Sequence, residues 1–374
     1  RHAKSLNPQA FVAVTGCYAE VNPAELERIA EADLVVGNAG KGSLAQVIRE
    51  RLADRHPWPE PESSPAPAAY GLGPMVADFA DHTRAFVKVQ EGCDGGCTYC
   101  IVPRARGPCR SVPPRDVVAQ VERLVEAGHP EIVLIGIHLG KYGVDLPDGP
   151  DLAGLVERVS QVPGLGRLRL SSIEPREITP RLVDLVTGHP RVCRHLHVPM
   201  QSGCDSVLER MGRPYDSRFY AHLIEALHAR EAGLCLGADV MVGFPGETEE
   251  EFAKTRELVR QLPLAYLHVF TYSRRPGTPA ANMPGQVPRE VALARNHELR
   301  ELSEVKRTAF ANSMVGQTLG TVFERLVADQ PGLLDGLTDN YLRLHAPGPP
   351  GVRGTLQVAE VIGSQGAVLI GRIL

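Results

Sequence analysis

Three cysteines in one short loop constrain this chain more than any other feature. Cys93, Cys97 and Cys100 follow a C-x3-C-x2-C spacing, directly after the apolar run at residues 85–89. Three thiolates can hold three corners of a cubane iron–sulfur cluster and leave the fourth iron open to a chelating substrate. Tetrahedral zinc would need a fourth ligand, for which Cys109 is a candidate, but no second pair of cysteines at zinc-site spacing lies nearby. We therefore expect a [4Fe-4S] cluster at these three cysteines.

The composition is that of a cytoplasmic protein without membrane spans. The chain has 374 residues with 43% hydrophobic and 22% charged residues, enough for two or three domains. No apolar run approaches the ~18 residues of a membrane span. Three of the eight cysteines lie in one loop, which favours a reducing compartment. Because the chain opens with Arg1 in the middle of a pattern, we expect the natural protein to begin further upstream.

The pattern after residue 82 predicts a partial (β/α)6 barrel, an α/β fold. Apolar strand candidates alternate with helical segments, and the cysteine loop follows the first of them. In such folds the chemistry gathers at the C-terminal ends of the strands. The strand candidates are Ala85–Gln90, Ile132–Ile135, Leu168–Ser171, His195–Pro199, Leu234–Val242 and Leu267–Phe270.

Four segments follow from the composition and periodicity. Residues 1–56 read as a small N-terminal α/β unit and residues 57–81 as a proline-rich linker. Residues 82–312 form the barrel domain, which a long helix closes. Residues 313–374 carry short strand patterns at Thr321–Glu324, Tyr341–Leu344, Leu356–Val361 and Ala367–Ile370, with turn residues between them. This last segment predicts a small β-barrel or sandwich.

Several predicted strands end in polar residues or glycines where an apolar core does not require them. Glu174 follows the third strand, Gln201 and Ser202 follow the fourth, and a turn from Gly243 to Gly246 ends the fifth. Glycines let a backbone approach a ligand, and a carboxylate can bind ribose hydroxyls or an amino group. The histidines at 138, 195 and 197 are expected to be packed or surface residues rather than catalytic bases.

Positive charge is concentrated around the cysteine loop. The net charge of the chain is −4, but residues 84–115 hold six basic and two acidic residues, a local net of +4. We expect Arg104, Arg106 and Arg110 to contact the phosphates of an RNA substrate. The same run of charge would also suit a solvated surface stretch without a ligand.

Taken together, these motifs resemble the radical S-adenosylmethionine (SAM) methylthiotransferases. The resemblance lies in six segments: Thr15–Tyr18, Gly92–Gly107, Ser171–Pro175, His197–Gly203, Gly237–Thr248 and Phe270–Pro279. It implies SAM bound at the open iron, with Tyr99 beside the adenine and Glu174, Gln201, Ser202, Gly243 and Gly246 as further cofactor contacts. It also implies a C-terminal TRAM-like β-domain that binds RNA, and an electron donor such as flavodoxin or ferredoxin.

The resemblance further implies a second, auxiliary [4Fe-4S] cluster in the N-terminal domain. Cys17 matches the third cysteine of that cluster, and the two expected before it precede Arg1. The residues 1–56 are thus interpreted as a remnant of a methylthiotransferase domain. We expect the chain as given to cleave SAM but not to transfer a methylthio group.

Within this family, residues 105–111, 195–199 and 337–343 look most like the branch that adds a methylthio group to C2 of N6-threonylcarbamoyladenosine at position 37 of tRNA. Two further branches remain open, acting on N6-isopentenyladenosine in tRNA or on an aspartate of a ribosomal protein. A radical SAM enzyme of a different reaction type would also carry the cysteine loop, and a metal-stabilised RNA-binding protein without catalysis would use its thiols for zinc. We expect a monomeric enzyme.

Overall fold

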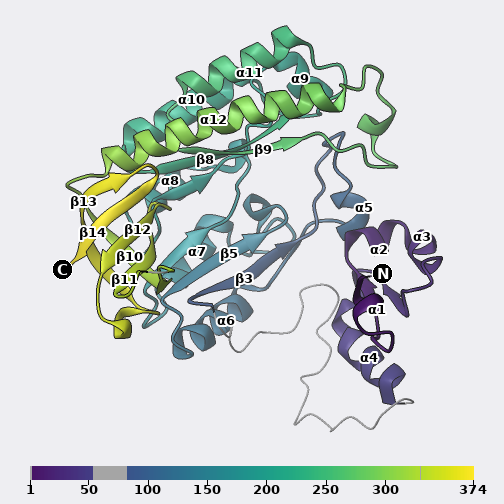
Figure 1. Cartoon of the computed structure of the whole chain (residues 1–374), viewed down its shortest axis with the longest axis horizontal. Coiled ribbons are helices and arrows are strands. Elements are labelled where there is room, and N and C mark those ends of the chain that lie inside the picture. Colours follow the sequence, from purple (N-terminus) through teal and green to yellow (C-terminus); the bar gives the residue numbers. More distant parts are fainter. Residues whose placement is uncertain (1, 54–81, 329) are drawn as a thin grey trace.

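The structure, a computed structural model, describes residues 2–53, 82–328 and 330–374, and its centre is a set of parallel strands with helices outside them (Figure 1). The strands lie in two sheets of order β4-β3-β5-β6 and β7-β8-β9. A parallel bridge between Leu168 and Val192 connects the two sheets. The parallel strands are β3 (Arg84–Glu91), β5 (Glu131–Gly136), β6 (Arg167–Leu170), β7 (His195–His197), β8 (Cys235–Val242) and β9 (Tyr266–Thr271), and β4 (Arg110–Ser111) pairs antiparallel with β3. The observed ends of all six parallel strands lie within two residues of the predicted ends, so the partial (β/α)6 barrel is confirmed.

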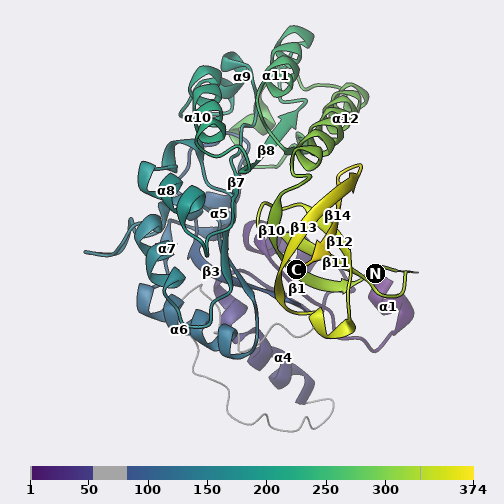
Figure 2. The same ribbon diagram turned by 90° about the vertical axis from the view of Figure 1, so that its left-hand side faces the viewer.

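Helices cover the outer faces of both sheets, because each strand sends its alternate apolar side chains outward into one shared core (Figure 2). On α6, Val117, Val121 and Leu124 form the predicted buried face. The predicted capping box at the start of α11 is present, with Glu251 N donating to Thr248 Oγ1 at 3.2 Å. The helices are α5 (Val102–Arg106), α6 (Pro114–Glu126), α7 (Leu152–Ser160), α8 (Pro180–Gly188), α9 (Asp205–Arg210), α10 (Ser217–Arg230), α11 (Glu249–Gln261) and α12 (Arg289–Ser313). Short 3-10 turns occur at η2 (Leu139–Lys141), η3 (Pro175–Glu177) and η4 (Pro279–Asn282).

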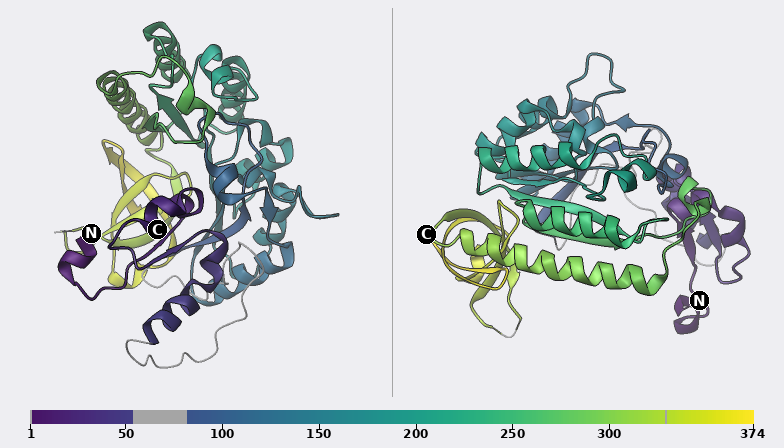
Figure 3. Two further views of the ribbon diagram at one scale, coloured as in Figure 1. Left: turned by 90° about the vertical axis from the view of Figure 1, so that its right-hand side faces the viewer. Right: turned by 90° about the horizontal axis from the view of Figure 1, so that it is seen from above.

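The long helix α12 runs beside β9 and on to the C-terminal domain (Figure 3). Leu267 N of β9 donates to Ser303 Oγ at 2.9 Å, and Asn296 Nδ2 donates to Val269 O at 2.9 Å. These side chains satisfy backbone groups along the outer edge of the second sheet, which an unpaired edge strand would expose. Helix α12 therefore closes one side of the open barrel.

Residues 314–374 fold into a small closed β-barrel of strand order β10-β11-β12-β14-β13. Its elements are β10 (Thr318–Leu326), β11 (Leu333–Thr338), β12 (Arg343–Pro347), η5 (Pro350–Val352), β13 (Leu356–Gln365) and β14 (Val368–Ile373). Strand β11 was missed in the sequence, because its Asp335 and Gly336 read as turn residues. In the fold, a Cβ at Gly336 would lie 2.5 Å from the Thr321 side chain, so glycine permits the close pairing with β10. Of the two folds predicted for this segment, a small barrel or a sandwich, the structure shows the barrel.

The N-terminal residues form a separate α/β unit at the end of the molecule opposite the C-terminal barrel (Figures 1 and 3). Two short parallel strands, β1 (Ala13–Thr15) and β2 (Leu34–Val36), are flanked by α1 (His2–Leu6), α2 (Cys17–Val21), α3 (Pro23–Glu27), η1 (Ala39–Ser43) and α4 (Leu44–Ala53). Pro23 opens α3 at the first helical position. The predicted linker at residues 57–81 lies outside the described residues. No helix in the described part of the chain combines the length and the apolar character that a membrane span requires.

Buried charges join the base of the barrel to the C-terminal domain. Glu131 on β5 is fully buried and accepts hydrogen bonds from Arg169 Nε at 2.7 Å and Arg167 Nε at 2.5 Å. The remaining guanidinium nitrogens donate to backbone oxygens of the C-terminal barrel, at Gly320 (2.8 Å) and Thr338 (2.9 Å) among others. Burial would raise the pKa of Glu131, but the two guanidinium groups outweigh it and lower that pKa to about 2.

Candidate active site

The cysteine loop (residues 92–107) follows β3, includes the short helix α5 and carries three free thiols. Each of its cysteines is half-buried. Gly95 N donates to Cys93 Sγ at 3.2 Å, and Val102 N donates to Cys100 Sγ at 3.4 Å. Amide hydrogen bonds to cysteine sulfur are a means by which a protein stabilises thiolate ligands and tunes a cluster. The donor set and its surroundings therefore fit an iron–sulfur cluster.

The turn after α9 fixes the middle of this loop. Thr98 N donates to Met211 O at 3.0 Å, and the Thr98 hydroxyl donates to Arg210 O at 2.8 Å. Gly212 has a φ of +71°, and a Cβ there would lie 2.7 Å from Gly96 O. Only glycine allows the two backbones to approach so closely.

A buried arginine connects the loop to the predicted cofactor residue Glu174. Arg213 Nη1 donates to Cys97 Sγ at 3.1 Å, and its Nη2 forms an ion pair with the Glu174 carboxylate. The Arg213 side chain is 3% exposed. Glu174 is therefore held beside the cysteine loop, as its position at a strand end predicts, and a positive charge lies against one thiol.

His138 makes the corresponding contact with another thiol. Its Nδ1 lies 3.2 Å from Cys93 Sγ, and its Nε2 lies 2.8 Å from Glu177 Oε1. Burial would lower the pKa of His138, but its hydrogen bonds to Cys93 and Glu177 raise that pKa to about 10. Burial would likewise raise the pKa of the Cys93 thiol, yet His138 and the Gly95 amide bring it below its usual range.

Tyr99 and the glycine turn of residues 243–246 meet above the sheet. The Tyr99 ring packs edge-on against Phe244, with ring centroids 6.3 Å apart. Gly243 and Gly246 both have positive φ, +73° and +77°. A Cβ at Gly243 would lie 2.6 Å from the Cβ of Ala292 on α12, so this glycine also allows the helix to pack closely.

Gln201 and Ser202 occupy different environments. Gln201 has a φ of +63° and extends the pairing along β8, since its amide donates to Asp239 O at 2.8 Å. Ser202 is fully buried, its hydroxyl lies 3.1 Å from Thr255 Oγ1, and it accepts from Cys204 N at 3.2 Å. The Ser202 side chain thus supports the turn from within.

The N-terminal unit places Cys17 next to the end of the cysteine loop. Arg106 Nε donates to Cys17 Sγ at 3.1 Å, and Arg106 Nη1 lies 3.2 Å from Glu91 Oε1 at the end of β3. Asn38 Nδ2 also donates to Ala105 O at 2.5 Å. One arginine thereby connects the thiol of the N-terminal unit to the end of the strand that precedes the other three cysteines.

The other two arginines predicted to contact RNA lie on the same loop and just beyond it. Arg104 is exposed and donates from Nη1 to Gly277 O at 3.1 Å. Arg110 is half-buried and donates from Nη2 to Arg106 O at 2.9 Å. Of the three, Arg104 presents the most accessible side chain.

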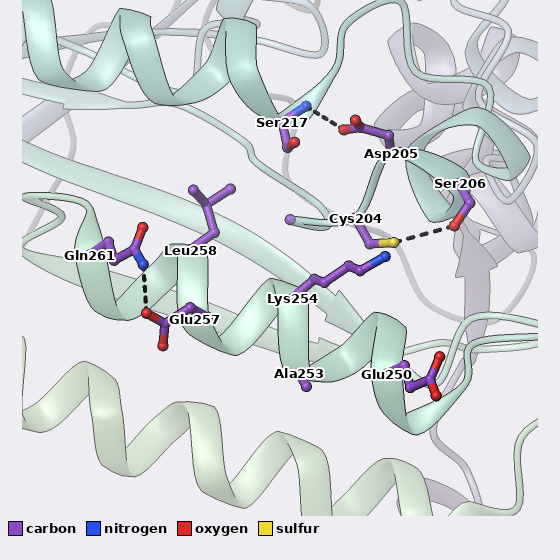
Figure 4. Close-up of a pocket in the computed structure, with 11 residues that line it drawn as sticks. Cys204, Asp205, Ser206, Ser217, Glu250, Ala253, Lys254, Glu257, Leu258 and Gln261 are labelled. Atoms are coloured by element: carbon purple, nitrogen blue, oxygen red, sulfur yellow. Dashed lines mark hydrogen bonds between the residues drawn. The ribbon is translucent and has the colours of Figure 1, made fainter.

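One cavity lies away from the cysteine loop. A cavity of about 640 Å3 opens on the outer, helical side between α9, the start of α10 and α11 (Figure 4). Its lining includes Asp205, Lys254 and Glu257 and shares no residue with the cysteine loop.

Comparison with known proteins identifies the family. Residues 87–259 match the model of the radical SAM superfamily. The chain is 38% identical over 364 residues to the threonylcarbamoyladenosine tRNA methylthiotransferase MtaB of Bacillus subtilis, covering 97% of this chain and 80% of the relative. It is 36% identical over 351 residues to the enzyme of that name from Aquifex aeolicus, covering 92% and 82%. The chain belongs to the radical SAM tRNA methylthiotransferase family.

A neighbouring branch of the family is also similar. The tRNA-2-methylthio-N(6)-dimethylallyladenosine synthase of Moorella thermoacetica is 36% identical over 379 residues, covering 99% of this chain and 84% of the relative. The prediction of a radical SAM methylthiotransferase is therefore confirmed by relatives from two branches. Among solved structures, the cobalamin-dependent SAM radical enzyme OxsB with aqua-cobalamin and SAM bound gives a TM-score of 0.48 at 12% identity, covering 81% of this chain and 45% of that one.

Two functional candidates were missed in the sequence. Arg213 follows a glycine turn after α9 and belongs to no recognisable sequence motif. Its role depends on the fold, which brings its side chain to Cys97. His138 was expected to be a packed or surface histidine, but it contacts Cys93. Its place at the end of β5, in Gly136–Gly140, was the one available signal.

Proposed function

We propose that the protein adds a methylthio group to C2 of N6-threonylcarbamoyladenosine at position 37 of tRNA. The likeness to relatives named for that reaction, over more than nine tenths of the chain, supports this substrate. The similarity to the dimethylallyladenosine branch makes that nucleoside the second candidate.

Cys93, Cys97 and Cys100 would hold a [4Fe-4S] cluster with one iron left for SAM. When bound, such a cluster supplies the single electron that cleaves SAM to the 5′-deoxyadenosyl radical. The chain's own residues orient and enclose this chemistry. Arg213 and His138 place positive charge against two of the thiols, and the Tyr99–Phe244 contact joins the cysteine loop to the glycine turn proposed to face SAM.

The observation that carries the methylthio transfer, rather than SAM cleavage alone, is the position of Cys17. Its thiol lies 3.1 Å from Arg106, and Arg106 also contacts Glu91 directly before the cysteine loop. An auxiliary cluster bound through Cys17 would therefore lie next to the site of the SAM cluster. That second cluster would provide the sulfur that is transferred.

The remaining assignments follow from this proposal. The unit at residues 1–56 is a methylthiotransferase domain, 57–81 a linker, 82–312 the radical SAM domain and 313–374 a TRAM-like domain that binds tRNA. Arg104, with Arg106 and Arg110 behind it, would contact the phosphates near the target nucleoside. A flavodoxin or ferredoxin would deliver electrons to a monomer in the cytoplasm.

Mass spectrometry of tRNA nucleosides tests the substrate. A strain lacking the gene should lose 2-methylthio-N6-threonylcarbamoyladenosine and accumulate its unthiolated precursor, and the restored gene should reverse both changes. A restored gene in which Cys97 is replaced by Ala should reverse neither change. Loss of the 2-methylthio-dimethylallyl nucleoside instead would assign the second candidate, and no change in either nucleoside would contradict both.

A further inference from the structure

A row of polar side chains lines the inner face of the second sheet, below the cysteine loop. On β7, β8 and β9, the residues that alternate with the apolar core residues include the polar residues His197, Asp239 and His268. They point away from the helices that cover the outer face and into the open barrel. A polar inner face needs either internal partners or a ligand.

These side chains form one hydrogen-bonded chain that runs from buried to exposed. The Tyr266 hydroxyl lies 3.1 Å from His197 Nδ1, and His197 Nε2 lies 2.9 Å from Asp239 Oδ1. Asp239 Oδ1 is in turn 3.5 Å from His268 Nδ1. The exposed fraction of the side chain rises from 6% at His197 to 23% at Asp239 and 51% at His268. Tyr266 and Asp239 hold the His197 ring at the buried end of this chain, and the His268 ring is its accessible end.

The accessible end opens on a cavity. A cavity of about 340 Å3 lies between β9 and α12 and is lined by His268, Phe270, Arg300 and Glu304 among others. Phe270 is 50% exposed although it is a large aromatic residue. Its place one alternation beyond His268 puts it about 7 Å nearer the C-terminal end of the strand.

That end of β9 leads to the cysteine loop. The segment that follows β9 docks on the loop, with Ala280 N donating to Thr98 O at 2.9 Å and Arg104 Nη1 donating to Gly277 O at 3.1 Å. Within the cavity lining, Phe270 therefore lies towards the C-terminal strand ends, where the cysteine loop is.

The chemistry of this cavity fits a nucleobase with a polar, anionic substituent. An exposed aromatic ring provides a stacking surface for a base. With its Nδ1 directed to Asp239, His268 offers Nε2 to the cavity, where a protonated ring donates to a carboxylate and a neutral ring accepts from an N–H or hydroxyl. Arg300 adds a guanidinium group, which suits a carboxylate. A purely hydrocarbon substituent would leave these groups without partners.

We propose that Phe270, His268 and Arg300 bind the target nucleoside, with Phe270 against the base and His268 and Arg300 on the threonylcarbamoyl side chain. This inference rests on the proposed function and adds the residues that select its substrate. Asp239 and His197 act as positioning residues for the His268 ring. A site built to form hydrogen bonds discriminates strongly against an analogue that cannot form them.

The test uses purified, cluster-loaded protein and two synthetic tRNA anticodon stem-loops, one with N6-threonylcarbamoyladenosine and one with unmodified adenosine. Replacing His268 by Phe (H268F) should weaken binding of the modified stem-loop about tenfold and leave binding of the unmodified one unchanged. H268Q, which keeps a hydrogen-bonding side chain, should recover part of the loss. The circular dichroism spectrum and the iron content of H268F should match those of the wild type, showing that the variant is folded. H222F, at an exposed histidine of α10, is the matched control.

The outcomes separate this inference from the proposed function. If tRNA from cells carrying the wild-type gene contains the methylthiolated threonylcarbamoyl nucleoside and H268F changes neither binding nor that product, the inference falls and the proposed function stands. If wild-type cells lack that product, the proposed function falls first. His197, Asp239 and His268 also offer ligand atoms within 4.8 Å of one another. One zinc ion per chain in the wild type and none in H268F would make them a metal site and overturn the inference.

Discussion

The buried carboxylate Glu131 gives the sharpest test of how the two barrels are held together. Its two hydrogen-bonding partners, Arg167 and Arg169, are 3% and 2% exposed, and both also donate to the C-terminal barrel. Replacing Glu131 by Gln keeps the shape of the side chain but removes the charge that compensates two buried guanidinium groups. Removing one partner of such a buried pair costs about 3–5 kcal/mol.

The lowered pKa of Glu131 gives a similar value for its contribution to the free energy of unfolding. A carboxyl whose pKa changes from 4.5 in the unfolded chain to about 2 in the fold contributes about 3 kcal/mol at neutral pH. Because the folded pKa is the lower one, this contribution is complete above pH 4.5 and is lost as the pH falls towards 2. The difference in stability between wild type and E131Q should shrink over that range.

Urea denaturation followed by circular dichroism measures the effect. At pH 7 we expect E131Q to lose about 3 kcal/mol of unfolding free energy. The control E157Q, which removes the partner of Arg181 at the surface, should lose less than about 1 kcal/mol. Equal losses in the two variants, or a difference for E131Q that does not shrink in acid, would refute the reasoning.

Three further changes probe the site and its surroundings. Gly212→Ala forces a Cβ to within 2.7 Å of a backbone oxygen of the cysteine loop, so iron content after reconstitution should fall at least twofold, whereas Gly188→Ala, with no atom within 4 Å, should leave it unchanged. Arg213→Met removes the hydrogen bond and the positive charge at Cys97 Sγ, so the reduction potential measured by redox titration should become more negative and SAM cleavage should slow about tenfold. Burial holds the pKa of His195 well below its usual value, so unfolding free energy should fall by up to about 1.4 kcal/mol per unit as the pH drops below about 6.5, and His195→Phe should reduce that slope.

Much of this fold could be predicted from the sequence because its signals are local. The alternation of strands and helices and the capping box at Thr248 depend on short stretches, and both are confirmed as structure. The missed features depend on contacts between distant residues. Arg167 and Arg169 alternate with leucines, which predicts a strand but gives no sign that both arginines are buried under another domain.

The candidate site divides in the same way. The sequence predicted Glu174 beside the cysteines because strand ends gather at one face, but its partner Arg213 comes from the turn after α9. The inner face of the second sheet was also missed. His197 and His268 lie 71 residues apart and are joined only when Asp239 stands between their strands.

The central claim is that three cysteines leave one iron of the cluster free to bind SAM. Electron–nuclear double resonance of the reduced, cluster-loaded protein tests it directly, with SAM carrying nitrogen-15 in its amino group. We predict a hyperfine coupling between the cluster and that nitrogen, lost when Cys97 is replaced by Ala. A fully loaded protein that shows no such coupling would contradict the account.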